Sequence, residues 1–555
     1  MRTPPTSQPS SAQPQPPPTR TVTPMRTALR ALRTLAPPLA FYLLTLALLA
    51  GVLGLALAVT GAAHSHHGAL LPVEVWGISA IIMCVLLYGL YAVRGPRRHG
   101  SRSRSAGVQV SRQQQPQLWR LVEQTAQASG VRAPHTLWLT DDSALSARQR
   151  PRLLGLLPSR HRLSLGVPLL VGLTEPQLAA LLAQQLGPAG SADIPLPGLL
   201  RRNRDTLRLV LDRYADTGAF GPGPRRWFGG IYAGYARTCL RWSASDARRL
   251  ELAADRTAAR IAGRDTAVTA LRRAQALAGL HQHYREEQVL IGWDQGVFPP
   301  AAEVLPAYQD WLRSRPGRQE LAALESEPPR ERIPRYDARP PLPERITRLL
   351  ELPADPGLPP EAATTEPPAP AEQLLADPLR TFAQVVQAGP GVAEKRQLPW
   401  DDLAAVVGRA ELDAAATGLL TSVTSVLRRR TPDLPTILDA IDEGRWAELA
   451  DWIPRTGAAR TVPVTVGRSL NLSTATQGLR ALVLAALVEQ GQARWTLDPQ
   501  RGRQLIPDPD TLDAVLRPAL DAATAPEPDT APLRRLLHPK YPKHPKPESP
   551  PTVER

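Results

Sequence analysis

Two carboxylates near the middle of the chain have the spacing of a catalytic or metal-binding pair. Glu251 and Asp255 stand four residues apart in the run ELAAD, so a helix would carry both on one face. A carboxylate can hold a metal ion, but a pair without imidazole ligands makes a poor zinc site. The alternative is a charged helix surface on which the acids face solvent or pair with neighbouring arginines, which are Arg248, Arg249 and Arg256. We favour this surface interpretation and keep metal binding as the alternative.

The histidines do not complete a metal site around these carboxylates. His281 and His283 stand two residues apart in HQHYREE, and side chains with that spacing point to different sides of a helix. His135 and His161 are isolated in the sequence. A further run, AAHSHHG, could bind a metal, although a short turn of this kind is more often solvated; its histidines are His64, His66 and His67. The sequence therefore predicts no rebuilt metal site.

Helices must position most of these side chains. Thr174 is a predicted N-cap, with Gln177 at the third helical position of a helix that Pro188 would end. The run 247–262 is a predicted amphipathic helix that Gly263 closes. The remaining patterns of this part predict one more helix and two short strands, over residues 118–128, 135–139 and 162–167. The predicted class is α+β, with helices dominating.

Five runs follow one another in this part of the chain, after two apolar segments. They are GVQV, PQLWRLVEQTAQASG, LSLGVPLLVGLTEPQLAALLAQQLGP, RRLELAADRTAARIAGR and YDARPPLPERITRLLEL. In this order they resemble the HtpX-like and CAAX-prenyl-protease-type family of membrane zinc metallopeptidases. The resemblance covers residues 94–352 and implies a mainly helical, zincin-like peptidase domain over residues 107–352.

The motif that holds zinc in that family is degenerate in this chain. The family carries HExxH on the helix after the LT segment, where two histidines bind zinc and the Glu activates a water molecule. The matching positions are Gln184, Gln185 and Pro188. An uncharged amide is a weak ligand and cannot accept a proton from water near neutral pH. Pro188 offers no ligand atom and interrupts a helix. We expect no catalytic residue at these positions.

Other positions of the family pattern are retained or replaced. Glu251 falls at the third zinc-ligand position, and Asp255 matches an Asp that lies behind the ligands in the family. Arg339 stands before a Pro pair, where the family usually has His. The resemblance therefore implies the ancestry of a zinc peptidase without its metal, and we expect neither zinc nor another cofactor. Zinc would be the cofactor only if other residues had taken over as ligands.

Two apolar segments near the N-terminus are long enough to cross a bilayer. Residues 38–62 carry no charge and residues 70–93 carry only Glu74, and about 20 apolar residues suffice for a transmembrane helix. Cys84 lies in the second segment and Cys239 far from it, so neither a disulfide nor a thiolate zinc site is expected. The outer flanks are basic and the connecting loop has no Lys or Arg; the flanking residues are Arg20, Arg26, Arg30, Arg33, Arg94, Arg97, Arg98, Arg102 and Arg104. The positive-inside rule then predicts a two-pass inner-membrane protein with both termini in the cytoplasm.

Composition divides the rest of the chain. Residues 1–34 and 539–555 are rich in Pro and polar residues and are predicted to be disordered. Residues 353–371 read as a Pro-rich linker, followed by a mostly helical domain over residues 372–530. The net charge of +15 comes almost wholly from Arg, which is interspersed with Asp and Glu and is typical of high-GC bacterial coding. We therefore expect the bilayer and other membrane proteins as partners, and no nucleic acid.

Two segments keep alternative interpretations. The run RRWFGGIYAGYARTCLRW, residues 225–242, is either an ordinary packed helix or a helix on the membrane surface with its aromatic residues at the interface. Near the C-terminus, a helix over residues 476–491 precedes a predicted hairpin in ARWTLDPQRGRQLIPD. This order is compatible with a winged-helix module, but the abundance of acidic residues favours a helical interaction domain.

Three functions are compatible with these features. The first is a pseudopeptidase that binds or regulates other membrane proteins without hydrolysis. The second is an active membrane zinc metalloendopeptidase with unusual ligands, for which Glu251 would be required. The third is a membrane-tethered scaffold that works through its C-terminal domain. The resemblance and the degenerate motif together favour the first.

Overall fold

The computed structural model describes residues 107–149, 161–187, 224–328, 340–353, 369–428, 432–454, 464–498, 502–507 and 509–537, with single residues between 43 and 61 and between 200 and 211. Within this part of the chain, no helix combines the length and the apolar character needed to cross a membrane. The second predicted span, residues 70–93, lies outside the described residues, as does most of the first, residues 38–62. The predicted disordered segments at residues 1–34 and 539–555 also lie outside them.

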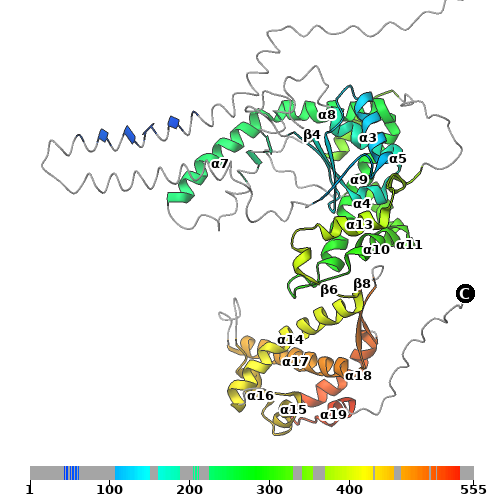
Figure 1. The fold of residues 1–555 in the computed structure, drawn as a ribbon. Helices are drawn as coiled ribbons and strands as arrows, with labels where there is room; N and C mark the ends of the chain where they lie inside the picture. Colours follow the sequence, from blue (N-terminus) through cyan, green and yellow to red (C-terminus); the bar gives the residue numbers. More distant parts are fainter. Residues whose placement is uncertain are drawn as a thin grey trace, which may run out of the picture.

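The first part of the structure is a mostly helical body that packs against a four-stranded sheet (Figure 1). The strands are β1 (Val108–Val110), β2 (Thr136–Thr140), β3 (Leu145–Gln149) and β4 (His161–Gly166). They lie in the order β1-β2-β4-β3, with β2 and β4 parallel and the outer pairs antiparallel. The helices of this part are α3 (Pro116–Ala128), α4 (Val167–Gly172), α5 (Glu175–Leu186), α7 (Pro224–Trp242), α8 (Ala244–Ala262), α9 (Arg264–Tyr284), α10 (Ala301–Arg313), α11 (Arg315–Ser326) and α12 (Leu342–Leu350).

The core of this body lies on one face of the sheet. Leu137 and Leu139 of β2 and Leu163 and Leu165 of β4 are fully buried, and they alternate with half-exposed residues as strands with one covered face require. Helices α3, α5 and α9 contribute the facing apolar residues. The start of α5 follows from its sequence, because Thr174 and Gln177 form the expected capping box. The predicted helices and strands of this part are present, with ends shifted by a few residues.

The chain beyond residue 368 corrects the predicted domain boundary. Ala371 of the expected linker is buried, and its backbone N–H donates to the carbonyl of Leu173. The next segment packs on the same core, through η4 (Ala371–Leu374), α13 (Pro378–Gln387) and η5 (Val392–Glu394). Strand β6 (Arg396–Gln397) then pairs in parallel with β5 (Val297–Phe298). The first body therefore extends to about residue 399, because composition marks Pro-rich segments but does not reveal which later helix completes a core.

The C-terminal part is a second helical body. Its elements are α14 (Trp400–Leu427), α15 (Leu434–Asp442), α16 (Trp446–Asp451), α17 (Val464–Glu489), β7 (Arg494–Asp498), β8 (Gly502–Ile506), α18 (Pro509–Ala523) and α19 (Ala531–Leu537). Helices α14 and α17 pack along each other, and the predicted hairpin β7–β8 crosses α14 at Gly408, where a methyl group would overlap the ring of Trp495. Helix α17 begins twelve residues before the predicted start at residue 476.

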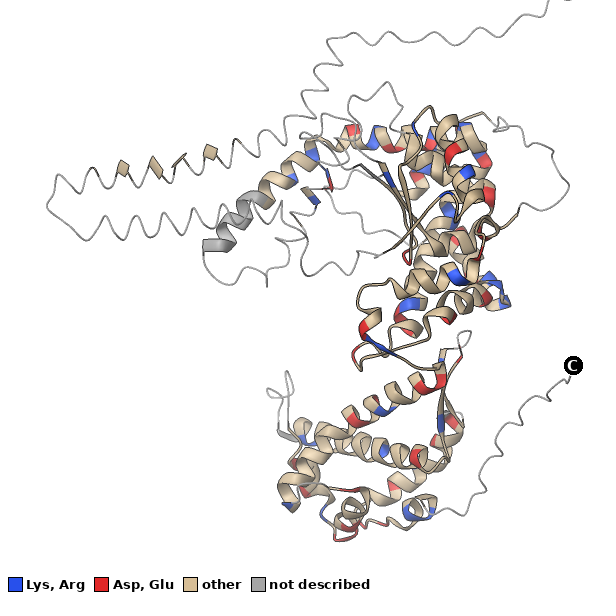
Figure 2. Cartoon of the chain, in the orientation of Figure 1, with Lys and Arg blue, Asp and Glu red and all other residues tan. Residues whose placement is uncertain are grey.

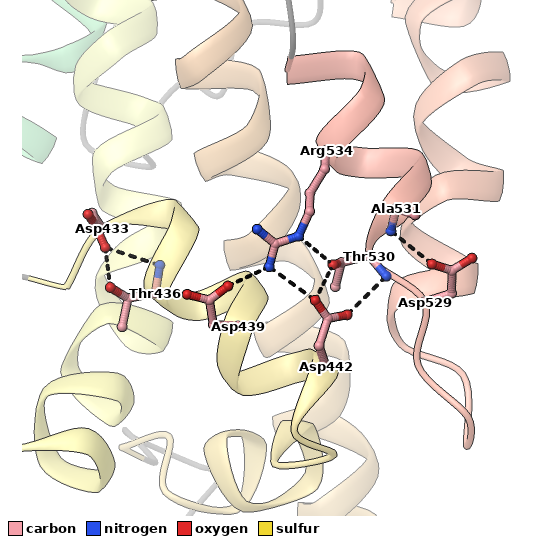
Figure 3. Close-up of polar contacts among 8 residues, drawn as sticks. All are labelled: Asp433, Thr436, Asp439, Asp442, Asp529, Thr530, Ala531 and Arg534. Carbon is pink, nitrogen blue, oxygen red and sulfur yellow. Dashed lines mark hydrogen bonds and ion pairs between the residues drawn. The ribbon is translucent and has the colours of Figure 1, made fainter.

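A polar cluster fastens the last helix of this body (Figure 3). Arg534 of α19 donates to Asp439 at 2.6 Å and to Asp442 at 3.0 Å, both on α15. The hydroxyl of Thr530 donates to Asp442 at 2.7 Å. Burial acts to raise the pKa of Asp442, but the hydrogen bonds from Thr530 and Arg534 outweigh it and lower that pKa. The cluster explains how the chain's last described helix is held without a large apolar face.

Candidate functional site

Gln184, which the resemblance aligns with the first histidine of HExxH, lies inside the contact between α5 and α8. Gln184 is buried, and its side-chain amide donates a hydrogen bond of 3.2 Å to Oδ1 of Asp255. The two helices approach closely one turn further along α5, since a methyl group on Gly187 would overlap the side chain of Thr257. The sequence therefore places an amide where the resemblance implies a metal-binding imidazole, and folding brings that amide onto the retained Asp255.

Arg345 of α12 completes this cluster. Its guanidinium donates to both carboxylate oxygens of Asp255, at 2.9 Å from Nε and 2.6 Å from Nη2. Only 3% of the Asp255 side chain and 11% of the Arg345 side chain are exposed, so the pair is shielded from water. A bidentate pair of this kind is strong and geometrically specific. We call Gln184, Asp255 and Arg345 the buried triad.

The triad corrects the favoured interpretation of Asp255. That interpretation put Asp255 on a charged helix surface, facing solvent or paired with a nearby arginine of its own helix. Instead Asp255 faces inward and pairs with Arg345, which lies ninety residues later in the chain. Arg248 pairs with Glu344, and Arg249 lies 3.9 Å from Asp246. Sequence periodicity could not reveal this, because α12 supplies the partner through tertiary packing.

Two further positions that the resemblance singles out, Glu251 and Gln185, are described and are not part of the triad. Glu251 is half-buried one turn before Asp255 and has no hydrogen bond or ion pair within the described residues. Gln185 is half-buried beside Gln184. Pro188 and Arg339 lie outside the described residues, so the structure does not place them relative to the triad.

The residues present do not fit a zinc ion. The amide nitrogen of Gln184 faces Asp255, and both oxygens of Asp255 accept hydrogen bonds from Arg345. Of Glu251 and Asp255, only Glu251 has no hydrogen bond or ion pair within the described residues, and zinc sites in proteins are built from three or four Cys, His, Asp or Glu ligands. Within the residues that the structure describes, no group of three His, Cys, Asp or Glu side chains could hold a metal ion.

A second buried cluster surrounds His281 and was not found from the sequence. His281 is buried and His283 is exposed, which agrees with the prediction that the two point apart. The Nε2 atom of His281 lies 3.9 Å from Oδ1 of Asp141, and Nη1 of Arg285 lies 2.9 Å from Oδ2 of that carboxylate. Asp141 follows β2, whereas Arg285 begins the π-helical turn η3 (Arg285–Val289).

Burial dominates the protonation of this cluster. It raises the pKa of Asp141 to about 6, against the opposing charge of Arg285. It lowers the pKa of His281 to about 3, and Arg285 acts in the same direction. Near neutral pH, His281 is therefore neutral beside an ionised Asp141. This arrangement positions the turn after α9 and lies on different elements from the triad.

His135 and His161 are not isolated in the fold, as the sequence suggested. Their rings stack with centroids 6.4 Å apart, and the backbone N–H of His161 donates to Nδ1 of His135 at 3.3 Å. Burial and the neighbouring His135 lower the pKa of His161. The pairing arises because β4 lies beside β2 in the sheet.

Three comparisons with known proteins give no match: no family model, no curated protein and no solved structure is similar to this chain.

Proposed function

We propose that this protein is a membrane-anchored, zincin-like pseudopeptidase of the HtpX-like type, which binds or regulates other membrane proteins without hydrolysing them. The observation that carries the proposal is the buried triad. At the position where an active relative would hold zinc, Gln184 is hydrogen bonded to an Asp255 that Arg345 neutralises. The cluster stabilises the contact of three helices and presents no base and no metal ligand to a substrate.

The sequence around the triad supports descent from an enzyme. ELAAD and ERI supply Asp255 and Arg345 at the places where the five runs resemble the family, and these two side chains do meet in the fold. What the chain lacks is the pair of imidazoles and the general base, for which Gln184, Gln185 and Pro188 stand. If the chain keeps the peptidase-type fold without the zinc ligands and the base, a binding function accounts for it best.

The anchor is supported by the first apolar segment. Its described residues are helical, and several of their large apolar side chains are exposed; these are Leu43, Leu46, Leu53 and Leu57. Exposure of such a run to water is unfavourable, whereas lipid chains would cover it. We therefore place the chain in the inner membrane with both termini in the cytoplasm, on the strength of the flanking arginines.

Strand β3 is the element best placed to bind a partner segment. It forms an edge of the sheet, because within the described residues only β4 pairs with it. Helix α5, which carries Gln184, lies beside β3. An unpaired strand edge can accept an extended segment through backbone hydrogen bonds. A photo-reactive residue at Ser146 should cross-link a bound partner in membranes, whereas one at Glu443 in the C-terminal body should not.

The test of the central claim is the metal content and peptidase activity of the full-length protein, purified in detergent without chelators or an affinity metal. We expect far less than one zinc per chain and no casein or peptide cleavage above that of the Glu251→Ala variant. Near-stoichiometric zinc, with cleavage that both o-phenanthroline and Glu251→Ala abolish, would show an active metallopeptidase with unusual ligands. If no partner cross-links at Ser146 but partners cross-link at Glu443 in the C-terminal body, the membrane-tethered scaffold would be favoured instead.

A further inference from the structure

Helices α7 and α8 expose several arginines and one tryptophan. Arg237, Arg241 and Trp242 are exposed at the C-terminal end of α7, and Trp242 keeps 77% of its surface accessible. On α8, Arg256 and Arg260 are exposed four residues apart and so share one face. We call Arg237, Arg241 and Trp242 the Arg-Trp face. Helix α7 runs outward from α8, away from α3, α5 and α9 (Figure 1).

The exposed arginines of α7 and α8 have no acidic partner among the described residues. Arg237, Arg241, Arg256 and Arg260 form no ion pair there, whereas neighbouring Arg248 and Arg249 pair with Glu344 and Asp246. Figure 2 shows the Lys and Arg positions along α7 and α8. The opposite side of α7 is packed against the protein. Ala236, Cys239 and Leu240 are buried there, and Arg204 donates a hydrogen bond to the carbonyl of Leu240. One side of α7 is therefore packed, and the other combines uncompensated positive charge with an exposed indole.

An anionic lipid surface matches both features of the face. Anionic headgroups attract exposed basic residues, by roughly a fivefold gain in surface binding for each residue. Trp is favoured at the headgroup level, where its ring is partly buried and its N–H stays hydrated. A soluble acidic partner would satisfy the arginines but would leave unexplained an indole that stands out at the edge of the packed body.

The length of the chain allows this contact. The second predicted span ends at residue 93 and β1 begins at Val108, so a short segment of the sequence separates the predicted span from the helical body. Fully extended, such a segment reaches about 45 Å. This step rests on the membrane anchor in the proposed function. With that anchor, the body stays close enough to the bilayer for a lipid-facing helix to touch it.

We propose that the Arg-Trp face docks on the anionic headgroups of the membrane that holds the chain, and so fixes the orientation of the helical body at the bilayer. Helix α7 then lies along the surface with Trp242 at the headgroup level. The docking orients α8, and with it the buried triad and the β3 edge, relative to the membrane. Segments of other membrane proteins that emerge from the bilayer would meet the sheet edge in a defined direction.

The test uses the full chain in lipid nanodiscs, with Cys84 and Cys239 replaced by Ala and a single fluorophore on Ser245→Cys. Ser245 is exposed three residues after Trp242. Discs contain phosphatidylcholine alone or with one third phosphatidylglycerol, and a nitroxide at the headgroup level quenches a fluorophore that lies on the lipid. We expect at least threefold stronger quenching in the anionic discs, and none for a fluorophore on Glu443→Cys in either disc.

Matched charge reversals test which residues carry the contact. Arg237→Glu with Arg241→Glu should return the Ser245→Cys quenching in anionic discs to the level of neutral discs. Arg315→Glu with Arg318→Glu, an equal charge change on exposed positions of α11, should leave it unchanged. Trp242→Ser should weaken it with the arginines intact.

The outcomes separate the inference from the proposed function. A chain that fails to enter discs would contradict the membrane anchor itself. A chain that enters the discs but shows equal quenching at Ser245 and Glu443 would overturn the docking inference alone. If added single-stranded RNA, and not anionic lipid, changes the Ser245 signal in a way that the Arg237 and Arg241 reversal abolishes, the face binds nucleic acid and the lipid assignment is wrong.

Discussion

Asp255 shows how the partners of a buried carboxylate fix its role in the fold. In the buried triad, Arg345 balances the charge of the Asp255 carboxylate through two hydrogen bonds. The side-chain amide of Gln184 donates a third hydrogen bond to the same carboxylate. A buried ion pair gains little over an apolar contact, but removal of one partner leaves an isolated charge in a medium that solvates it poorly. We therefore expect that replacing Arg345 or Asp255 alone destabilises the fold, because its partner would remain buried without a counter-charge.

Arg345→Ala should destabilise the protein strongly for this reason. We expect a loss of about 3–5 kcal/mol in the free energy of unfolding, measured by urea denaturation of the first body. Arg348→Ala, which removes an exposed pair with Glu351 on the same helix, should cost less than about 1 kcal/mol. Equal effects of the two substitutions would show that Asp255 is not buried as described.

The pair Asp141 and His281 should give opposite pH dependences when each is removed. Between pH 4 and 6 the unfolded chain has an ionised Asp141 and a protonated His281, whereas the folded chain has the reverse, so the two contributions cancel. In Asp141→Asn only His281 remains, and stability should fall as the pH drops from 6 to 4. In His281→Gln only Asp141 remains, and stability should fall as the pH rises from 4 to 6.

The expected slopes are about 1.4 kcal/mol per pH unit relative to the unsubstituted protein, with opposite signs. Urea denaturation at half-unit pH steps measures them. His283→Gln, at an exposed position two residues away, should run parallel to the unsubstituted protein throughout. Parallel curves for Asp141→Asn as well would mean that these groups titrate normally in the folded state.

At the scale of elements, the approach of α5 to α8 decides whether the triad can form. The close point is Gly187, whose backbone is helical and would suit any residue, so its glycine is required by space and not by conformation. The side chain of Thr257 fills the space that a Cβ would take. Helix α12 contacts the same carboxylate through Arg345.

Gly187→Ala should therefore push the two helices apart. We expect a cost of about 1–3 kcal/mol, typical of overpacking, with partial recovery in the double variant with Thr257→Ala. Gly279→Ala on α9 is the matched control, because nothing lies within contact distance of a methyl group there. That change should be neutral or stabilising by up to about 1 kcal/mol, as expected for Ala in a helix.

At the scale of the whole molecule, the first body is completed by residues that follow the Pro-rich segment. Phe382, Val385 and Val386 of α13 are buried in the core that also holds the sheet. Gln115, before α3, accepts from the backbone N–H of Ala376 and donates to Thr381. The two bodies then meet at a small apolar cluster formed by Val297, Leu403, Ala404 and Leu497.

Truncation of the chain should reveal this boundary. A chain that ends after Pro353 exposes the core face of α10 and α4 and should be rapidly digested by trypsin or aggregate. A chain that ends after Pro399 should remain as resistant as the full-length protein over residues 107–399. Phe382→Ala in the full chain should cost about 3–5 kcal/mol. A stable chain ending at Pro353 would restore the linker boundary that composition suggested.

The sequence alone determined the local elements of this protein. Apolar periodicity, the Thr174 cap and the Gly263 terminator are local signals, and the corresponding helices and strands are present. The sequence also shows that Gln184 and Pro188 offer no imidazole, since residue type alone decides whether a side chain can bind zinc as His does. Composition likewise marked the apolar N-terminal segments, which lie largely outside the described residues.

Only the tertiary structure decided how distant residues are paired. Asp255 and Arg345 are ninety residues apart, and Asp141 and His281 are on elements that meet only when α9 packs over the sheet. The addition of α13 to the first core is a contact of the same kind. Such pairings depend on which helix and strand faces pack together. Many of these faces have similar apolar patterns, so the sequence pattern alone does not predict which two faces are in contact.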